Sequence, residues 1–129
     1  MGYGIKIINA IASGLLMFAI SLGALASHLL KTKLSQDSLS SFEIGVRYLI
    51  YHGLALLIVN GLNAIDLDVK LTFSKLALSG IFLFSGSIFM LSTQEIHGWP
   101  VKFLGPITPI GGILLISAWG YLTVAFLKK

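Results

Sequence analysis

The chain contains 129 residues, enough for one domain. Apolar residues make up 56% of it and charged residues 11%, whereas a typical soluble domain carries about 25% charged residues. So few charges cannot cover the surface of a soluble monomer, and so apolar a chain does not stay disordered. The absence of cysteine excludes disulfides, thiolate catalysis and thiolate-bound metal. The net charge of +4 comes from scattered bases, which argues against nucleic acid as a partner.

Four apolar runs dominate the sequence, at residues 7–30, 45–65, 73–93 and 104–127. Each run has about 20 residues or more, enough for a helix to cross a hydrocarbon core of about 30 Å. Lipid cannot satisfy an open backbone, so helices are expected, and the connecting segments are short and polar. The sequence therefore predicts an all-α integral membrane protein with one membrane domain over residues 1–129. Its expected architecture is an antiparallel bundle of four transmembrane helices joined by short loops.

The positions of the bases predict the orientation in the membrane. An even number of spans places both termini on one side, and loops rich in Lys and Arg stay in the cytoplasm. The two sides carry nearly equal numbers of bases, and the imbalance grows if Arg47 points into the bundle. We expect a multi-pass protein of the cytoplasmic (inner) membrane with both termini in the cytoplasm. The side of the termini carries Lys6, Lys70, Lys75, Lys128 and Lys129, and the other side carries Lys31, Lys33, Arg47 and Lys102.

Small residues form stripes along the apolar runs. In membranes such stripes let helix backbones approach closely, so we interpret them as packing faces, with a solute path as the alternative. The stripe of the first run follows helical spacing and ends in a histidine. Its residues are Ala10, Gly14, Met17, Ser21, Ala24 and His28.

The second run is unusual because it contains ionisable residues. Glu43, Arg47 and Tyr51 are spaced four apart, as are Tyr48 and His52, and Glu43 can pair with Arg47 along the helix. An ionisable residue inside a membrane span is costly and by default suggests a functional site.

The topology predicts that polar residues from other runs lie at the same depth as this group. His28 ends the first run and Thr108 begins the fourth, on the side opposite the termini. Three interpretations stay open. The cluster holds helices together by hydrogen bonds, or it forms a proton or small-solute site, since histidine titrates near neutral pH. As a third alternative, His28 and His52 ligate a haem or a metal; no supporting motif is present, so we predict no cofactor and no metal.

Prolines and glycines mark the start of the fourth run. Pro106 and Pro109 are tolerated in the first turn of a helix, where a missing N–H costs nothing. If Pro109 lies deeper, it kinks the helix, and Gly111 and Gly112 let a neighbour cover the gap. We favour the first alternative. No hydrolase motif or phosphate loop occurs, and we predict that the protein is not an enzyme.

Four motifs give the chain a family resemblance. Gly23-Ala24 with His28 comes first, and Tyr48 to His52 followed by Ala55-Leu56-Leu57 comes second. The third motif is Leu83-Phe84-Ser85-Gly86-Ser87, and the fourth is Thr108-Pro109-Ile110-Gly111-Gly112 with Trp119 after it. On these motifs the chain resembles the YgdD/YwdK-like family of small membrane proteins. The first motif departs from the family's Gly-Ala-Phe-Gly-Ala-His pattern, and Leu29 replaces a glycine, which weakens any expectation of close backbone approach there.

The resemblance implies a four-span protein of the bacterial cytoplasmic membrane but no activity. It also adds two serines to the predicted polar cluster, whose full membership is His28, Glu43, Arg47, Tyr48, Tyr51, His52, Ser85, Ser87 and Thr108. We expect a packing, assembly or accessory factor whose partners are the lipid bilayer and either itself or another membrane protein. The alternative is a proton or small-solute carrier or channel that uses the cluster.

Overall fold

The computed structural model describes residues 2–128, and Lys129 of the orientation count lies outside them. Four long helices make up most of this part: α1 (Gly2–Leu25), α3 (Gln36–Asn60), α4 (Leu67–Ser92) and α6 (Ile107–Leu127). All described regular elements are helical, and four segments are long and apolar enough to cross a membrane. The predicted all-helical membrane fold is therefore confirmed. The short elements are a π-helical turn (Ala26–Leu30), α2 (Lys31–Lys33), α5 (Gln94–His97) and a 3-10 turn (Lys102–Leu104).

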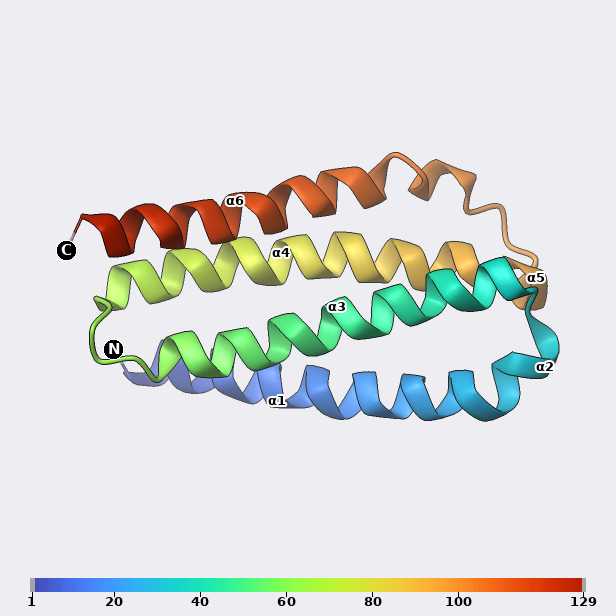
Figure 1. Ribbon diagram of the computed structural model, residues 1–129, viewed down its shortest axis with the longest axis horizontal. Coiled ribbons are helices and arrows are strands. Elements are labelled where there is room, and N and C mark those ends of the chain that lie inside the picture. Colours follow the sequence, from blue (N-terminus) through green and yellow to red (C-terminus); the bar gives the residue numbers. More distant parts are fainter. Residues whose placement is uncertain (1, 129) are drawn as a thin grey trace.

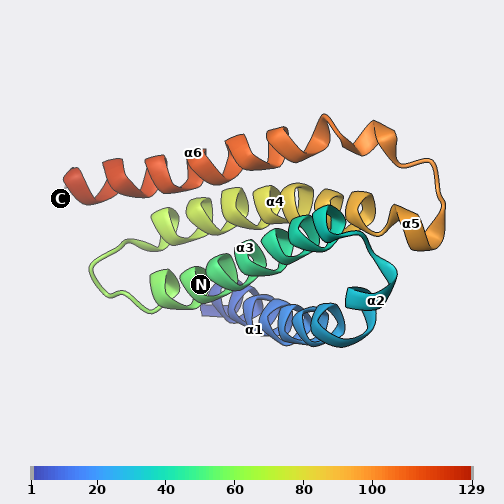
Figure 2. The same ribbon diagram turned by 45° about the vertical axis from the view of Figure 1, so that its right-hand side comes forward.

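The long helices lie side by side in the order α1, α3, α4, α6, and each runs opposite to its neighbour (Figure 1). The turned view in Figure 2 keeps this order, with α6 against α4 and α1 against α3. Side chains from all four helices meet in one apolar cluster, which includes Ala12, Leu56, Phe73 and Ala118. The core therefore joins the four helices rather than separate pairs.

Helix α3 begins at Gln36, well before the predicted start near residue 45, and ends at Asn60. The Ser35 hydroxyl accepts a hydrogen bond from the N–H of Ser38 over 3.2 Å, and Asp37 lies in the first turn. A capping hydroxyl and an acidic first turn both stabilise a helix start, so the polar segment before the apolar run is helical too. As a result, His52 lies about two turns from the end of α3 on the side of the termini.

Helix α1 turns a different face to the bundle from the predicted one. Ala12 and Ala19 are buried on α1, and Ala26, the first residue of the π-helical turn that follows, continues the heptad spacing. The small-residue stripe lies on the outer side: Met17 is 70% exposed, and nothing lies within 4 Å of where a Cβ on Gly14 would be. Both stripes consist of small residues, so their chemistry did not distinguish inside from outside.

Glycine brings α4 and α6 into close contact. A Cβ on Gly111 would lie 2.8 Å from the Gly80 carbonyl oxygen and would contact the backbone nitrogen of Phe84. Such contact leaves no space for a side chain, so the two helix backbones touch at this point. Pro106 precedes α6 and Pro109 lies in its first turn, where no backbone hydrogen bond is lost, so Pro109 marks the helix start and not a kink.

The two loops opposite the termini are tied to each other. The Glu95 carboxylate accepts hydrogen bonds from the backbone N–H of Ser35 over 3.3 Å and from its hydroxyl over 3.2 Å. Hydrogen bonds from the Ser38 side chain and the Ser35 backbone lower the pKa of Glu95. The loop after α1 is therefore joined to the loop after α4 through an ionised carboxylate.

Candidate functional site

His52 is buried, and both of its ring nitrogens are engaged. The indole Nε1 of Trp119 donates to His52 Nε2 over 3.1 Å, and His52 Nδ1 lies 2.8 Å from the Tyr48 carbonyl oxygen. Because indole can only donate, Nε2 accepts, and the proton resides on Nδ1, which donates to Tyr48. This arrangement fixes a neutral imidazole and joins α3 to α6.

Serines on α4 link it to both neighbouring helices. The Ser85 hydroxyl donates to the Gly45 carbonyl oxygen over 2.8 Å, which joins α4 to α3. The Ser87 hydroxyl donates to the Phe84 carbonyl over 3.0 Å and lies 2.5 Å from Thr108 Oγ1 on α6, so Thr108 is the donor to Ser87. Within residues 2–128, no buried side-chain nitrogen or oxygen lacks a hydrogen-bond partner. The interior of the bundle is polar in places but fully satisfied.

A second set of interhelical hydrogen bonds was not predicted from the sequence. The Asn60 amide donates to Asn9 Oδ1 over 3.2 Å, and the buried Ser74 hydroxyl donates to Asn60 Oδ1 over 3.4 Å. These bonds join α1, α3 and α4 near the side of the termini. An asparagine within an apolar run was the available signal, because lipid does not satisfy an amide.

The remaining members of the predicted cluster do not point into the bundle. Glu43, Arg47 and Tyr51 are exposed along one stripe of α3, and no hydrogen bond or ion pair joins any of them to another described residue. Tyr51 is 55% exposed and makes only a ring contact with Tyr48, at 5.7 Å between centroids. The intrahelical pair between Glu43 and Arg47 is therefore not formed. We call the stripe Glu43, Arg47 and Tyr51 the outer face of α3.

The two histidines that we expected at one depth are separated. His28 lies exposed on the π-helical turn at the side opposite the termini, whereas His52 is buried toward the other side. The early start of α3 explains the difference, because it moves His52 past the middle of the helix. The expected convergence of the cluster at one depth is thus corrected: His52, Ser85, Ser87 and Thr108 bond inside the bundle, at more than one level. His28, Glu43, Arg47 and Tyr51 lie outside, and Tyr48 is partly exposed.

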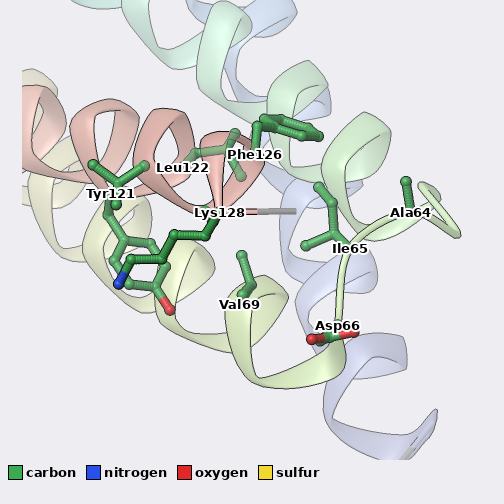
Figure 3. Close-up of a pocket in the computed structure, with 10 residues that line it drawn as sticks. Ala64, Ile65, Asp66, Val69, Tyr121, Leu122, Phe126 and Lys128 are labelled. Atoms are coloured by element: carbon green, nitrogen blue, oxygen red, sulfur yellow. The ribbon is translucent and has the colours of Figure 1, made fainter.

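An open pocket of about 380 Å³ lies at the end of the bundle that carries the termini (Figure 3). Its side chains come from the connection before α4, the first turn of α4 and the end of α6, and most of them are apolar. Asp66, Tyr121 and Lys128 supply its polar groups. None of the predicted site residues lines this pocket.

Four apolar helices with a sealed, hydrogen-bonded interior define a small integral membrane protein. Residues 22–112 match the model of a family described as "Protein of unknown function (DUF423)", and the chain belongs to this family. The match confirms the family resemblance seen in the four motifs, and no solved structure matches the chain.

Similar proteins carry membrane-protein names. The UPF0382 membrane protein SAB0533 of Staphylococcus aureus (strain bovine RF122 / ET3-1) is 40% identical over 115 residues, which cover 87% of this chain and 88% of the relative. A UPF0382 membrane protein of Staphylococcus epidermidis (strain ATCC 12228 / FDA PCI 1200) is 39% identical over 113 residues, with the same coverage. The UPF0382 membrane protein YwdK of Bacillus subtilis (strain 168) is 34% identical over 119 residues, covering 87% and 89%.

Proposed function

We propose that this protein is a non-enzymatic assembly or accessory factor of the bacterial cytoplasmic membrane. It acts by binding another membrane-spanning segment along the outer face of α3. The observation that carries the proposal is Arg47, which faces outward from a spanning helix without a partner in residues 2–128.

An outward arginine in a span requires compensation. Insertion of Arg at the centre of a membrane helix costs about 2.5–3.5 kcal/mol, and such residues normally face a bundle interior or pair with a second charge. Glu43 and Tyr51 lie one turn away on either side, and neither has a hydrogen bond or an ion pair with another residue of 2–128. A neighbouring helix with polar side chains would satisfy all three groups at once, as polar contacts between helices do in membranes.

The carrier or channel alternative has less support. His52 is the buried histidine of the predicted cluster, and its two nitrogens are already bonded within the protein. A proton relay needs a histidine that exchanges its proton with a changing partner. We therefore do not propose transport.

Positional crosslinking tests the proposal. A photoreactive side chain at Leu54, one heptad after Arg47, should yield protein adducts in native membranes, and Arg47→Ala should abolish them. The matched control places the same group at Ile116 of α6, which is 74% exposed and lies in a helix without charged residues. Lipid adducts alone at Leu54, or protein adducts that ignore Arg47→Ala, would refute the proposal.

We also propose that both termini lie in the cytoplasm. The chain has no cysteine, so one introduced cysteine reports its own location. A membrane-impermeant maleimide added to intact cells should label Thr32→Cys, in the segment after α1, and should spare Leu127→Cys at the end of α6. The opposite labelling pattern would reverse the orientation.

A further inference from the structure

We infer that the partner of the outer face of α3 is a second copy of this chain, with Arg47 of each copy paired to Glu43 of the other. The inference rests on the proposed function, because it names the segment that binds there. Its basis is the combination of opposite charges on one unpartnered face.

The order of charges along α3 disfavours an anionic lipid as the partner. Glu43 lies one turn closer than Arg47 to the polar start of the helix, whose first turn contains Asp37. A phosphate approaching Arg47 from that side has to pass the Glu43 carboxylate, and like charges repel. A face that carries both an acid and a base is instead complementary to itself, as a symmetric dimer requires.

The membrane imposes a geometry that suits this pairing. Copies of one chain insert in the same orientation, so two α3 helices facing each other run parallel about a two-fold axis. Four residues separate Glu43 from Arg47, which is about 6 Å along the axis, and packed helices lie about 8–10 Å apart. Side chains tilt toward the helix N-terminus. Arg47 therefore leans toward the level of Glu43 on the second copy.

The same face continues as a surface that can be buried between two copies. Tyr51 follows Arg47 by one turn, and Leu54 and Ile58 extend the stripe, 47% and 62% exposed. A phenol offers both a donor and an acceptor, and the two apolar residues provide close packing beyond the charges. The outer face thus combines polar pairing at one end with apolar contact at the other.

The test uses the purified full-length protein in liposomes at high dilution in lipid. Leu54→Cys should form disulfide-linked dimers on mild oxidation, and Ile116→Cys, a more exposed control on the uncharged helix α6, should not. In the Leu54→Cys background, Arg47→Glu alone or Glu43→Arg alone places like charges on the face. The crosslinked fraction should then fall about tenfold, because the symmetric dimer loses two interhelical polar contacts.

Mixing the two charge variants separates pairing between copies from pairing along one helix. The Arg47→Glu copy carries two acids on the face and the Glu43→Arg copy carries two bases. Together they should form mixed dimers at or above the level of the unaltered face, although each variant alone crosslinks far less. This recovery also demonstrates that both variants are folded and inserted.

Two results would overturn the inference: no dimer through Leu54→Cys, or a dimer that charge reversal leaves unchanged. The proposed function is tested separately from the dimer. Protein adducts in native membranes that depend on Arg47, combined with a monomeric purified protein, would leave the assembly role intact with a different partner. Absence of such adducts together with absence of dimers would remove both.

Discussion

Helix α3 presents polar groups on two faces, and the two faces differ in how those groups are satisfied. On the inner face, His52 and the Gly45 carbonyl each bond to a neighbouring helix. On the outer face, Glu43 and Arg47 bond to no described residue. The same helix thus carries polar groups that hold one chain together and polar groups that the single chain leaves unused.

The comparison separates two roles that look alike in a sequence. A polar residue on the inner face contributes to the free energy of unfolding of the monomer, because its loss leaves a buried partner unpaired. A polar residue on the outer face contributes only when something binds there. Substitutions on the inner face should therefore change monomer stability, and those on the outer face should change association.

The largest effect is expected where α4 and α6 touch. Gly111→Ala places a methyl group against the Gly80 carbonyl and the Phe84 backbone, so the helices must separate, at a cost of about 1–3 kcal/mol. The control is Gly112→Ala, whose Cβ would come no closer than 3.8 Å to the Phe84 ring. Equilibrium unfolding in mixed detergent micelles measures both. Equal effects of the two variants would refute the close contact.

Two adjacent residues of α3, one exposed and one buried, provide the next test. His52→Leu leaves the Trp119 indole N–H without its acceptor and should lower the free energy of unfolding by about 1–2 kcal/mol. Tyr51→Phe removes a hydroxyl from the outer face and should leave monomer unfolding within about 0.5 kcal/mol of the unaltered chain. If Tyr51→Phe destabilises the monomer as much as His52→Leu does, the division into two faces is wrong.

A smaller effect is expected at Ser85, whose hydroxyl joins α4 to α3. Ser85→Ala removes one interhelical hydrogen bond, a contact worth about 0.6 kcal/mol on average in membranes. Ser79→Ala, an exposed serine on the same helix, is the control and should be neutral. Equilibrium unfolding in the same micelles measures the loss of unfolding free energy in both variants. A larger loss for Ser79→Ala than for Ser85→Ala would contradict the prediction.

The smallest effect is a pH dependence of the tie between the loops. The pKa of Glu95 is lowered from its ordinary value of 4.5 by hydrogen bonds from Ser38 and Ser35. A lowered folded pKa means that the bonded carboxylate stabilises the tie fully above pH 4.5 and loses this effect as pH falls through the lower folded value. The amide chemical shift of Ser35 should report the loss, and Glu95→Gln should abolish the pH response. A response that persists in Glu95→Gln would assign it to another group.

The helical fold was predictable from the sequence because four apolar runs of membrane length allow little else. Hydropathy alone did not locate the start of α3, because the helix extends beyond the apolar run to a Ser35 cap; only the Ser and Asp residues of the segment 31–41 indicated a helix start there. That extension changed the depth of His52 relative to His28.

The direction in which each polar residue points was the least predictable property. In a soluble helix the apolar stripe indicates the inside, but a membrane helix is apolar on all sides, so its pattern carries no such signal. Small residues occur on both faces of α1, and Arg47 and His52 occur on opposite faces of α3. Which polar residues bond to one another depends on how each helix is rotated about its own axis. This rotation is known only from the folded structure.

The bond between His52 and Trp119 also constrains how the protein is made. Trp119 follows His52 by 67 residues, and synthesis adds about 5–20 residues per second, so His52 is synthesised roughly 3 to 13 s before Trp119, the donor to its Nε2. During this interval the first hairpin, α1 and α3, sits in the bilayer with Asn9 and Asn60 already able to bond to each other. His52 Nε2 gains its hydrogen bond only when α6 has been synthesised and packs against the other helices. Helix α6 thus completes the interior, and in a chain truncated before α6 the His52 imidazole lacks the Trp119 donor.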